Sequence, residues 1–142
     1  FGENPEVDCI KPISVFASDT GSFWVLDQGY ENIINVQNGS GELPRPQLEQ
    51  FPSLVGICGT SKGTILFTDS KLNKVFEFDP EQENLIEFVT SKSLSQPTGI
   101  AFSEQNNEIW VVETAEHRIA IFDKLGNRHL NPIFSPCGFF EK

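Results

Sequence analysis

The chain has 142 residues, of which 38% are hydrophobic, and its charged side chains give a net charge of −10 at pH 7. This length and apolar content suffice for one ordinary domain with a core, which excludes an intrinsically disordered chain. No apolar run is long enough to span a bilayer. The acidic balance disfavours nucleic-acid binding, which needs a basic face with stacking aromatic side chains.

Short β-branched and aromatic runs follow one another along the chain, and none of them shows a helical period. Turn residues separate the runs, so the chain is expected to form antiparallel meanders. Strands are expected over residues 12–15, 22–27, 32–36, 55–57, 64–69, 73–79, 85–89, 97–102, 109–112, 118–123 and 128–134.

The runs repeat along the chain. An acidic residue closes the second run of each set, and these residues, Asp27, Asp69 and Glu113, are 42 and 44 residues apart. Four-stranded propeller blades repeat at about 40–45 residues, whereas helical repeats are usually shorter. The spacing therefore predicts a series of β-propeller blades.

Residues 97–123 carry the pattern P-x-G-I-A-F…I-W-V-V-E-T-A-E-H-R-I-A-I-F-D, which resembles the NHL repeat. A second copy lies over residues 54–79. A third, over residues 12–36, matches less closely because Ser14 replaces the glycine and Asn32 stands where arginine is usual. The resemblance implies an all-β fold, in which four-stranded antiparallel meanders form the blades of an NHL-type propeller.

The whole chain, 1–142, is predicted to be a single partial propeller, about half of a six-bladed ring. Residues 1–4 resemble the tail of a preceding repeat. Two prolines make residues 42–50 an irregular loop where the first blade would have its outer strand. The remaining blades would come from missing sequence, which we favour, or from another chain. The blades are expected over residues 9–50, 51–93 and 94–135, with 136–142 starting a further blade.

The repeated acidic position has two interpretations. In the structural one, each carboxylate caps the tight loop that follows by accepting backbone N–H groups. In the functional one, the three carboxylates surround the channel mouth and bind a cation. One residue per blade is what a fold requirement produces, so the structural interpretation is preferred. Arg118 is expected to pair with Glu113, and Lys74 and Arg118 to form salt bridges between blades.

The sequence supports neither a metal site nor a cofactor. His117 and His129 lack the spacing of a zinc site, and no nucleophile motif is present, so no catalytic residue is assigned. Cys58 is expected to be a buried thiol, while a bridge between Cys9 and Cys137 stays open. Two tryptophans at one strand position, Trp24 and Trp110, are both expected in the core.

In propellers of this kind, the loops that join second to third strands gather on one face, where partners dock. The predicted function is a protein-interaction or scaffolding module, whose partner is another protein or the remaining blades of the propeller. The alternative is a portion of a metal-dependent hydrolase or lyase whose catalytic groups lie mostly outside this chain. The candidate contact residues are Tyr30, Lys71, Leu72, Glu116 and His117.

Overall fold

The computed structural model describes residues 9–37, 51–89, 94–129 and 133–134. Within them the chain forms three antiparallel sheets, each a meander in which neighbouring strands follow one another in sequence. The one helical element is a single 3-10 turn, η1 (Thr114–Glu116). No helix in the described part of the chain is long and apolar enough to cross a membrane.

The first sheet contains β1 (Pro12–Ala17), β2 (Ser22–Asp27) and β3 (Asn32–Gln37). The second contains β4 (Leu54–Gly59), β5 (Ile65–Asp69), β6 (Lys74–Asp79) and β7 (Asn84–Glu87). The third contains β8 (Pro97–Ser103), β9 (Glu108–Glu113), β10 (Arg118–Asp123) and β11 (Ile133–Phe134). The all-β prediction is therefore confirmed.

The outer strands differ most from the sequence prediction. In the second sheet, β7 ends at Glu87, although the N–H of Phe88 still donates to Val75 O on β6 at 2.8 Å, and Phe88 and Val89 are part of the core. In the third sheet only two residues pair with β10 as a strand, supplemented by an isolated bridge between Phe122 and Arg128. The loop expected at 42–50 lies outside the described residues.

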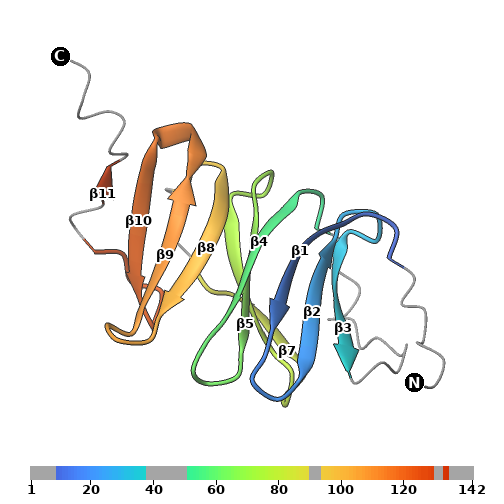
Figure 1. Cartoon of the computed structure of the whole chain (residues 1–142). Coiled ribbons are helices and arrows are strands. Elements are labelled where there is room, and N and C mark those ends of the chain that lie inside the picture. The colour runs from blue at the N-terminus through green and yellow to red at the C-terminus, as the bar shows by residue number, and fades with distance from the viewer. Residues whose placement is uncertain (1–8, 38–50, 90–93, 130–132, 135–142) are drawn as a thin grey trace.

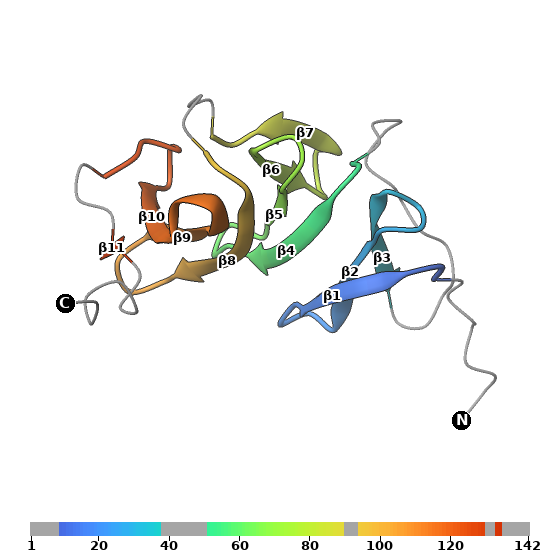
Figure 2. The same cartoon turned by 90° about the horizontal axis from the view of Figure 1, so that it is seen from above.

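The sheets stand side by side, with their first strands adjacent: β4 lies between β1 and β8 (Figures 1 and 2). Two apolar clusters fill the spaces between sheets. Aromatic rings dominate the cluster between the first and second sheets, where Phe67 stacks on Phe76 with ring centroids 5.4 Å apart. Aliphatic side chains such as Leu66, Val75 and Val111 dominate the other cluster.

The middle sheet is covered on both faces, so every residue of β5 is buried. The end sheets are covered on one face only. The uncovered face of the first sheet exposes Val15 and Phe23, and that of the third exposes Val112. The outer faces of both end sheets thus carry exposed apolar side chains.

Two core predictions can be compared with the structure. Cys58 is buried in β4, as expected, and so is Trp24, which packs edge-on against Phe78. Trp110 was expected in the core too, and this was wrong. It is half-buried on the outer side of the third sheet, where none of the three described sheets packs against it, and its indole N–H donates to Glu108.

Candidate functional site

The strands alternate in direction, so the connections between them lie at two opposite ends of the sheets (Figure 1). The loops between second and third strands, residues 28–31, 70–73 and 114–117, share the end that is uppermost in Figure 1. We call this end the loop face. The connections between first and second strands lie at the other end and border a cleft.

A buried carboxylate holds each of the first two loops of the loop face. Asp69 is fully buried and accepts N–H bonds from Lys71 at 3.0 Å and Leu72 at 2.9 Å in the loop that follows it. It also accepts the N–H of Ser53 at 2.9 Å, from the segment that enters β4. Asp69 therefore ties the loop to the start of its own blade.

Asp27 has the same role in the first blade. It accepts the N–H groups of Gly29 at 2.8 Å and Tyr30 at 3.1 Å from its loop. From the segment that enters β1, it accepts those of Ile10 at 2.9 Å and Lys11 at 3.1 Å. This is the geometry that the capping interpretation requires.

Glu113 departs from the pattern because its longer side chain reaches two arginines instead of the loop. No side chain caps the following turn η1. The carboxylate pairs with Arg118 at 2.5 Å and Arg128 at 3.0 Å, and accepts the N–H of Ser95 at 3.2 Å. Burial acts to raise the pKa of Glu113, but the hydrogen bonds and charges of the arginines outweigh it and lower the pKa below its ordinary value.

Among the described residues the salt bridges run within blades, which corrects the expectation that Lys74 and Arg118 bridge neighbouring blades. The predicted pairing of Arg118 with Glu113 is confirmed. Lys74 on β6 pairs with Glu87 on β7, its neighbour in the same sheet. Arg118 on β10 lies opposite Glu113 on β9. Cross-strand neighbours are the nearest partners for these side chains, because adjacent strands are closer than adjacent sheets.

The Glu113 cluster makes a pH-dependent contribution to stability. A carboxylate with a lowered folded pKa stabilises the fold above the pKa of the unfolded chain, and this stabilisation is lost as the pH falls through the folded value. We expect Glu113→Gln to lower the free energy of unfolding by about 2 kcal/mol at pH 7, since both arginines keep some solvent contact. The difference in unfolding free energy between the two proteins, measured by urea titration, should shrink progressively as the pH falls below the ordinary glutamate pKa of about 4.3. A constant difference down to about pH 2.5 would contradict the assignment.

The predicted contact residues all lie on the loop face. Leu72 is 40% exposed, and Lys71, Glu116 and His117 are also exposed. Tyr30 is half-buried and therefore differs from Leu72, its counterpart in the next blade. The last residue of each loop has a left-handed backbone, with φ of 54° at Glu31, 56° at Asn73 and 52° at His117. The three loops thus end in the same left-handed backbone conformation.

The carboxylates of the repeated position are engaged by the chain itself. The oxygens of Asp27 and Asp69 accept backbone N–H groups, which a bound cation would have to displace. Among the described residues, no cluster of three or more His, Cys, Asp or Glu side chains is arranged to hold a metal ion. Burial raises the pKa of the Cys58 thiol to about 12, so it stays protonated at neutral pH.

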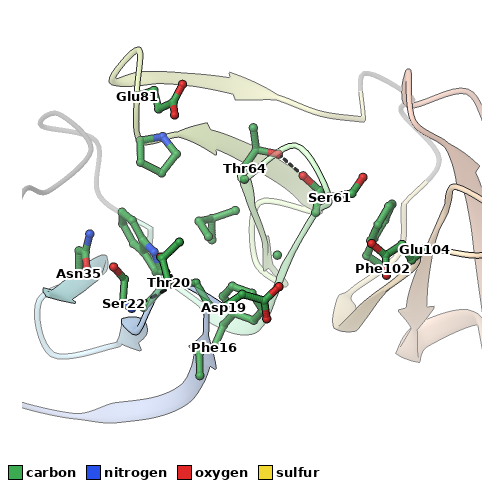
Figure 3. A pocket seen from close by; sticks show the side chains of 18 residues that line it. Phe16, Asp19, Thr20, Ser22, Asn35, Ser61, Thr64, Glu81, Phe102 and Glu104 are labelled. Atoms are coloured by element: carbon green, nitrogen blue, oxygen red, sulfur yellow. Dashed lines mark hydrogen bonds between the residues drawn. The ribbon is translucent and has the colours of Figure 1, made fainter. Parts of the chain in front are cut away.

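The opposite end of the sheets carries a cleft of about 630 Å³ between the first and second blades (Figure 3). We call it the interblade cleft. Its walls come from the β1–β2 turn, the β4–β5 loop, the β6–β7 turn and part of β3, and the start of the β8–β9 turn lies at its far end. Polar side chains are prominent in its lining: Ser18, Asp19, Thr20, Ser22, Asn35, Thr60, Ser61, Thr64, Glu81 and Glu104.

The sequence prediction missed this cleft. Its residues come from turns that are far apart along the chain and match no motif. One signal was available: Asn35 interrupts the run Ile33-Ile34-Asn35-Val36, in a strand that was otherwise expected to pack apolar side chains. A polar residue in such a run points either to a hydrogen bond or to a site.

Comparison with known proteins supports the fold. The sequence profile of the NHL repeat matches residues 94–122. The selenomethionine-substituted virginiamycin B lyase from Staphylococcus aureus superposes with a TM-score of 0.74 at 20% identity, over 95% of this chain and 43% of the lyase chain. No sequence among the curated proteins matches significantly.

Two further structures are similar. One chain of a nidogen/laminin complex gives a TM-score of 0.74 at 17% identity, over 90% of this chain and 52% of that chain. Regucalcin from Agrobacterium tumefaciens, a calcium-binding protein, gives a TM-score of 0.68 at 18% identity, over 88% of this chain and 45% of the regucalcin chain. The chain thus spans about half the length of the proteins it resembles. It carries an NHL repeat over residues 94–122 and has the fold of a partial NHL-type β-propeller.

Proposed function

We propose that the chain is the partner-binding part of an NHL-type propeller and that it binds a protein through the loop face. The observation that carries this proposal is the common geometry of the three loops. They lie at the same end of adjacent sheets, and buried carboxylates fix the first two. Loops on a rigid scaffold are the usual place for contact residues, because little ordering is needed on binding.

The side chains of the loop face suit a protein contact. Leu72 offers exposed apolar surface, and Lys71, Glu116 and His117 add exposed polar and charged groups to the same face. An apolar centre with a polar rim is the usual anatomy of a protein interface. A nidogen/laminin complex is among the similar structures, and it supports this class of partner by analogy of fold only.

The alternative, a metal-dependent hydrolase or lyase, has weaker support. A lyase and a calcium-binding protein are among the similar structures. However, the carboxylates Asp27, Asp69 and Glu113 already have backbone or arginine partners. An enzymatic role would therefore depend on residues outside this chain.

Site-specific crosslinking tests the proposal. A photo-reactive amino acid at Leu72 is expected to give discrete crosslinked products in an extract of the source organism. The matched control is Leu125, which is 75% exposed but lies in the β10–β11 turn, at the end opposite the loop face. The partner recovered from Leu72 should bind the Leu72→Asp variant at least about tenfold more weakly, and Leu125→Asp with unchanged affinity. Crosslinks from Leu125 alone, or equal losses in both variants, would refute the proposal.

A further inference from the structure

We infer that the interblade cleft binds a ligand carrying an ammonium or guanidinium group, at a site separate from the loop face. Three features of the cleft point to this chemistry: a buried amide without a partner, carboxylates without partners, and a lining without basic side chains. The ligand is defined by its cationic N–H donors, which a free amine or the basic side chain of a protein can supply.

The buried amide belongs to Asn35. Its side chain is 7% exposed, and its Oδ1 atom has no hydrogen-bond partner in the described part of the chain. Asn35 on β3 lies opposite Trp24 on β2, so both side chains are on the face of the first blade that turns toward the second. An unpaired buried carbonyl is costly, and a donor entering the cleft would satisfy it. The amide can turn about χ2 to present its oxygen, since this torsion has two broad wells.

The residue that corresponds to Asn35 in the second blade does have a hydrogen-bond partner, so the unpaired side chain is particular to the first blade. There the residue is Glu77, whose carboxylate accepts the hydroxyl of Thr64 at 2.8 Å. Thr64 in turn contacts Thr60 at 2.7 Å. The polar residue of the second blade is thus satisfied within the chain, whereas Asn35 is not.

Glu104 lies at the far end of the cleft, and the carboxylates of the first two blades are the exposed Asp19 and Glu81, which Figure 3 shows on two turns that border the cleft. Neither has an ion-pair or hydrogen-bond partner for its carboxylate within the described residues. Both turns are held in place. The N–H of Ser18 donates to Ser22 O at 2.8 Å, and that of Glu81 to Asp79 Oδ1 at 2.9 Å.

The lining of the cleft contains no Lys, Arg or His among the residues that the structure describes. The nearest basic residue along the chain is Lys62, which follows Ser61 but lines the two neighbouring clefts instead. Carboxylates gathered without a counter-charge attract cations and form charge-assisted hydrogen bonds with their N–H groups. A volume of about 630 Å³ is that of a small-molecule site and also admits a short peptide segment.

The test is an NMR titration of the full 142-residue chain labelled with ¹⁵N. The probes are n-butylammonium and a blocked pentapeptide with lysine at its centre. Their neutral counterparts are n-pentanol and the same peptide with the lysine acetylated. Both cations should give saturable shifts at the amides of residues 19–22, 35, 61 and 81, and the neutral probes should not. Tighter binding of the peptide by about tenfold or more would identify a protein side chain as the source, and equal affinity would identify a free amine.

Substitutions in the lining test whether the NMR shifts come from binding in the interblade cleft. Asp19→Asn combined with Glu81→Gln should weaken binding of the cation about fivefold. Glu83→Gln, the same change two residues further along the turn and outside the lining, should not. Asn35→Leu should weaken binding while raising the melting temperature, because it removes an unpaired buried amide.

The outcomes also separate this site from the loop face. Shifts confined to residues 70–73 and 114–117, or equal shifts with the acetylated peptide, would overturn the inference and leave the proposed function untouched. Unchanged affinity in the Asp19→Asn/Glu81→Gln variant would overturn it as well. A melting temperature lowered by Asn35→Leu, without loss of binding, would show that Asn35 is only structural.

Discussion

We expect Asp69→Ala to lower the free energy of unfolding by about 3 kcal/mol. Asp69 is fully buried and accepts N–H bonds from Ser53, Lys71 and Leu72. Alanine would leave these donors without an acceptor, and each unsatisfied buried donor costs about 1–3 kcal/mol, with losses that are not additive. Equilibrium urea unfolding, followed by tryptophan fluorescence, measures the difference.

Two further variants make this expectation specific. Asp69→Asn keeps one oxygen that can accept from the loop, but it places an amide NH₂ against one of the N–H donors. We therefore expect a loss of unfolding free energy smaller than that of Asp69→Ala. Asp79→Ala removes a carboxylate that accepts N–H bonds from Glu81 and Gln82 in a solvent-exposed turn. Water replaces that acceptor, so the loss should stay below about 1 kcal/mol. Equal losses at Asp69 and Asp79 would contradict the proposed role of burial.

We expect Gly56→Ala to destabilise the chain by about 2–3 kcal/mol, because it forces two blades apart. A Cβ atom on Gly56 would lie 2.3 Å from the carbonyl oxygen of Thr98 in the next blade. Backbone lies on both sides of this contact, so no side chain can turn away. The same contact region holds a hydrogen-bonded link, in which Thr68 Oγ1 accepts from Gly56 N–H at 3.0 Å and donates to Thr98 O at 2.6 Å.

Gly99 is the matched control, since it occupies the same position in the third blade. A Cβ atom there would meet only the side chain of Val112, at 3.4 Å from Cγ2 and 3.9 Å from Cβ, because none of the described sheets covers that face. We expect Gly99→Ala to change the stability of this chain by less than about 0.5 kcal/mol. If both glycine variants unfold at the same urea concentration, close packing between the second and third blades is not the reason that position 56 requires glycine.

The repeat in the sequence marks one candidate site, the loop face, but not the other, the interblade cleft. The loop-face residues were found from the sequence because Asp27, Asp69 and Glu113 recur in phase and fix where each loop begins. The sequence could not show that Glu113 would pair with Arg118 and Arg128 instead of capping its loop. That pairing depends on the longer side chain of glutamate and on the isolated β-bridge between Phe122 and Arg128, which brings Arg128 back to β10.

The same distinction explains the errors in the prediction. Trp24 and Trp110 occupy one position of the repeat, and periodicity assigns both to the core. Their burial differs because the second blade covers Trp24, whereas Trp110 lies on the uncovered side of the third sheet. Arg118 was correctly assigned to Glu113, but the salt bridges of Lys74 and Arg118 were wrongly expected between blades, since strand pairing within a sheet decides which carboxylate lies nearest.

The sequence by itself determined the fold class, the positions of the inner strands and the repeat, because period-2 alternation and turn residues are local properties of the chain. Only the tertiary structure decided which polar groups are left without partners. The interblade cleft is lined by Asp19, Asn35 and Glu81, which come from turns and a strand of two blades. That they line one cleft depends on how the sheets pack against one another, and packing between blades leaves no periodic trace in any single stretch of sequence.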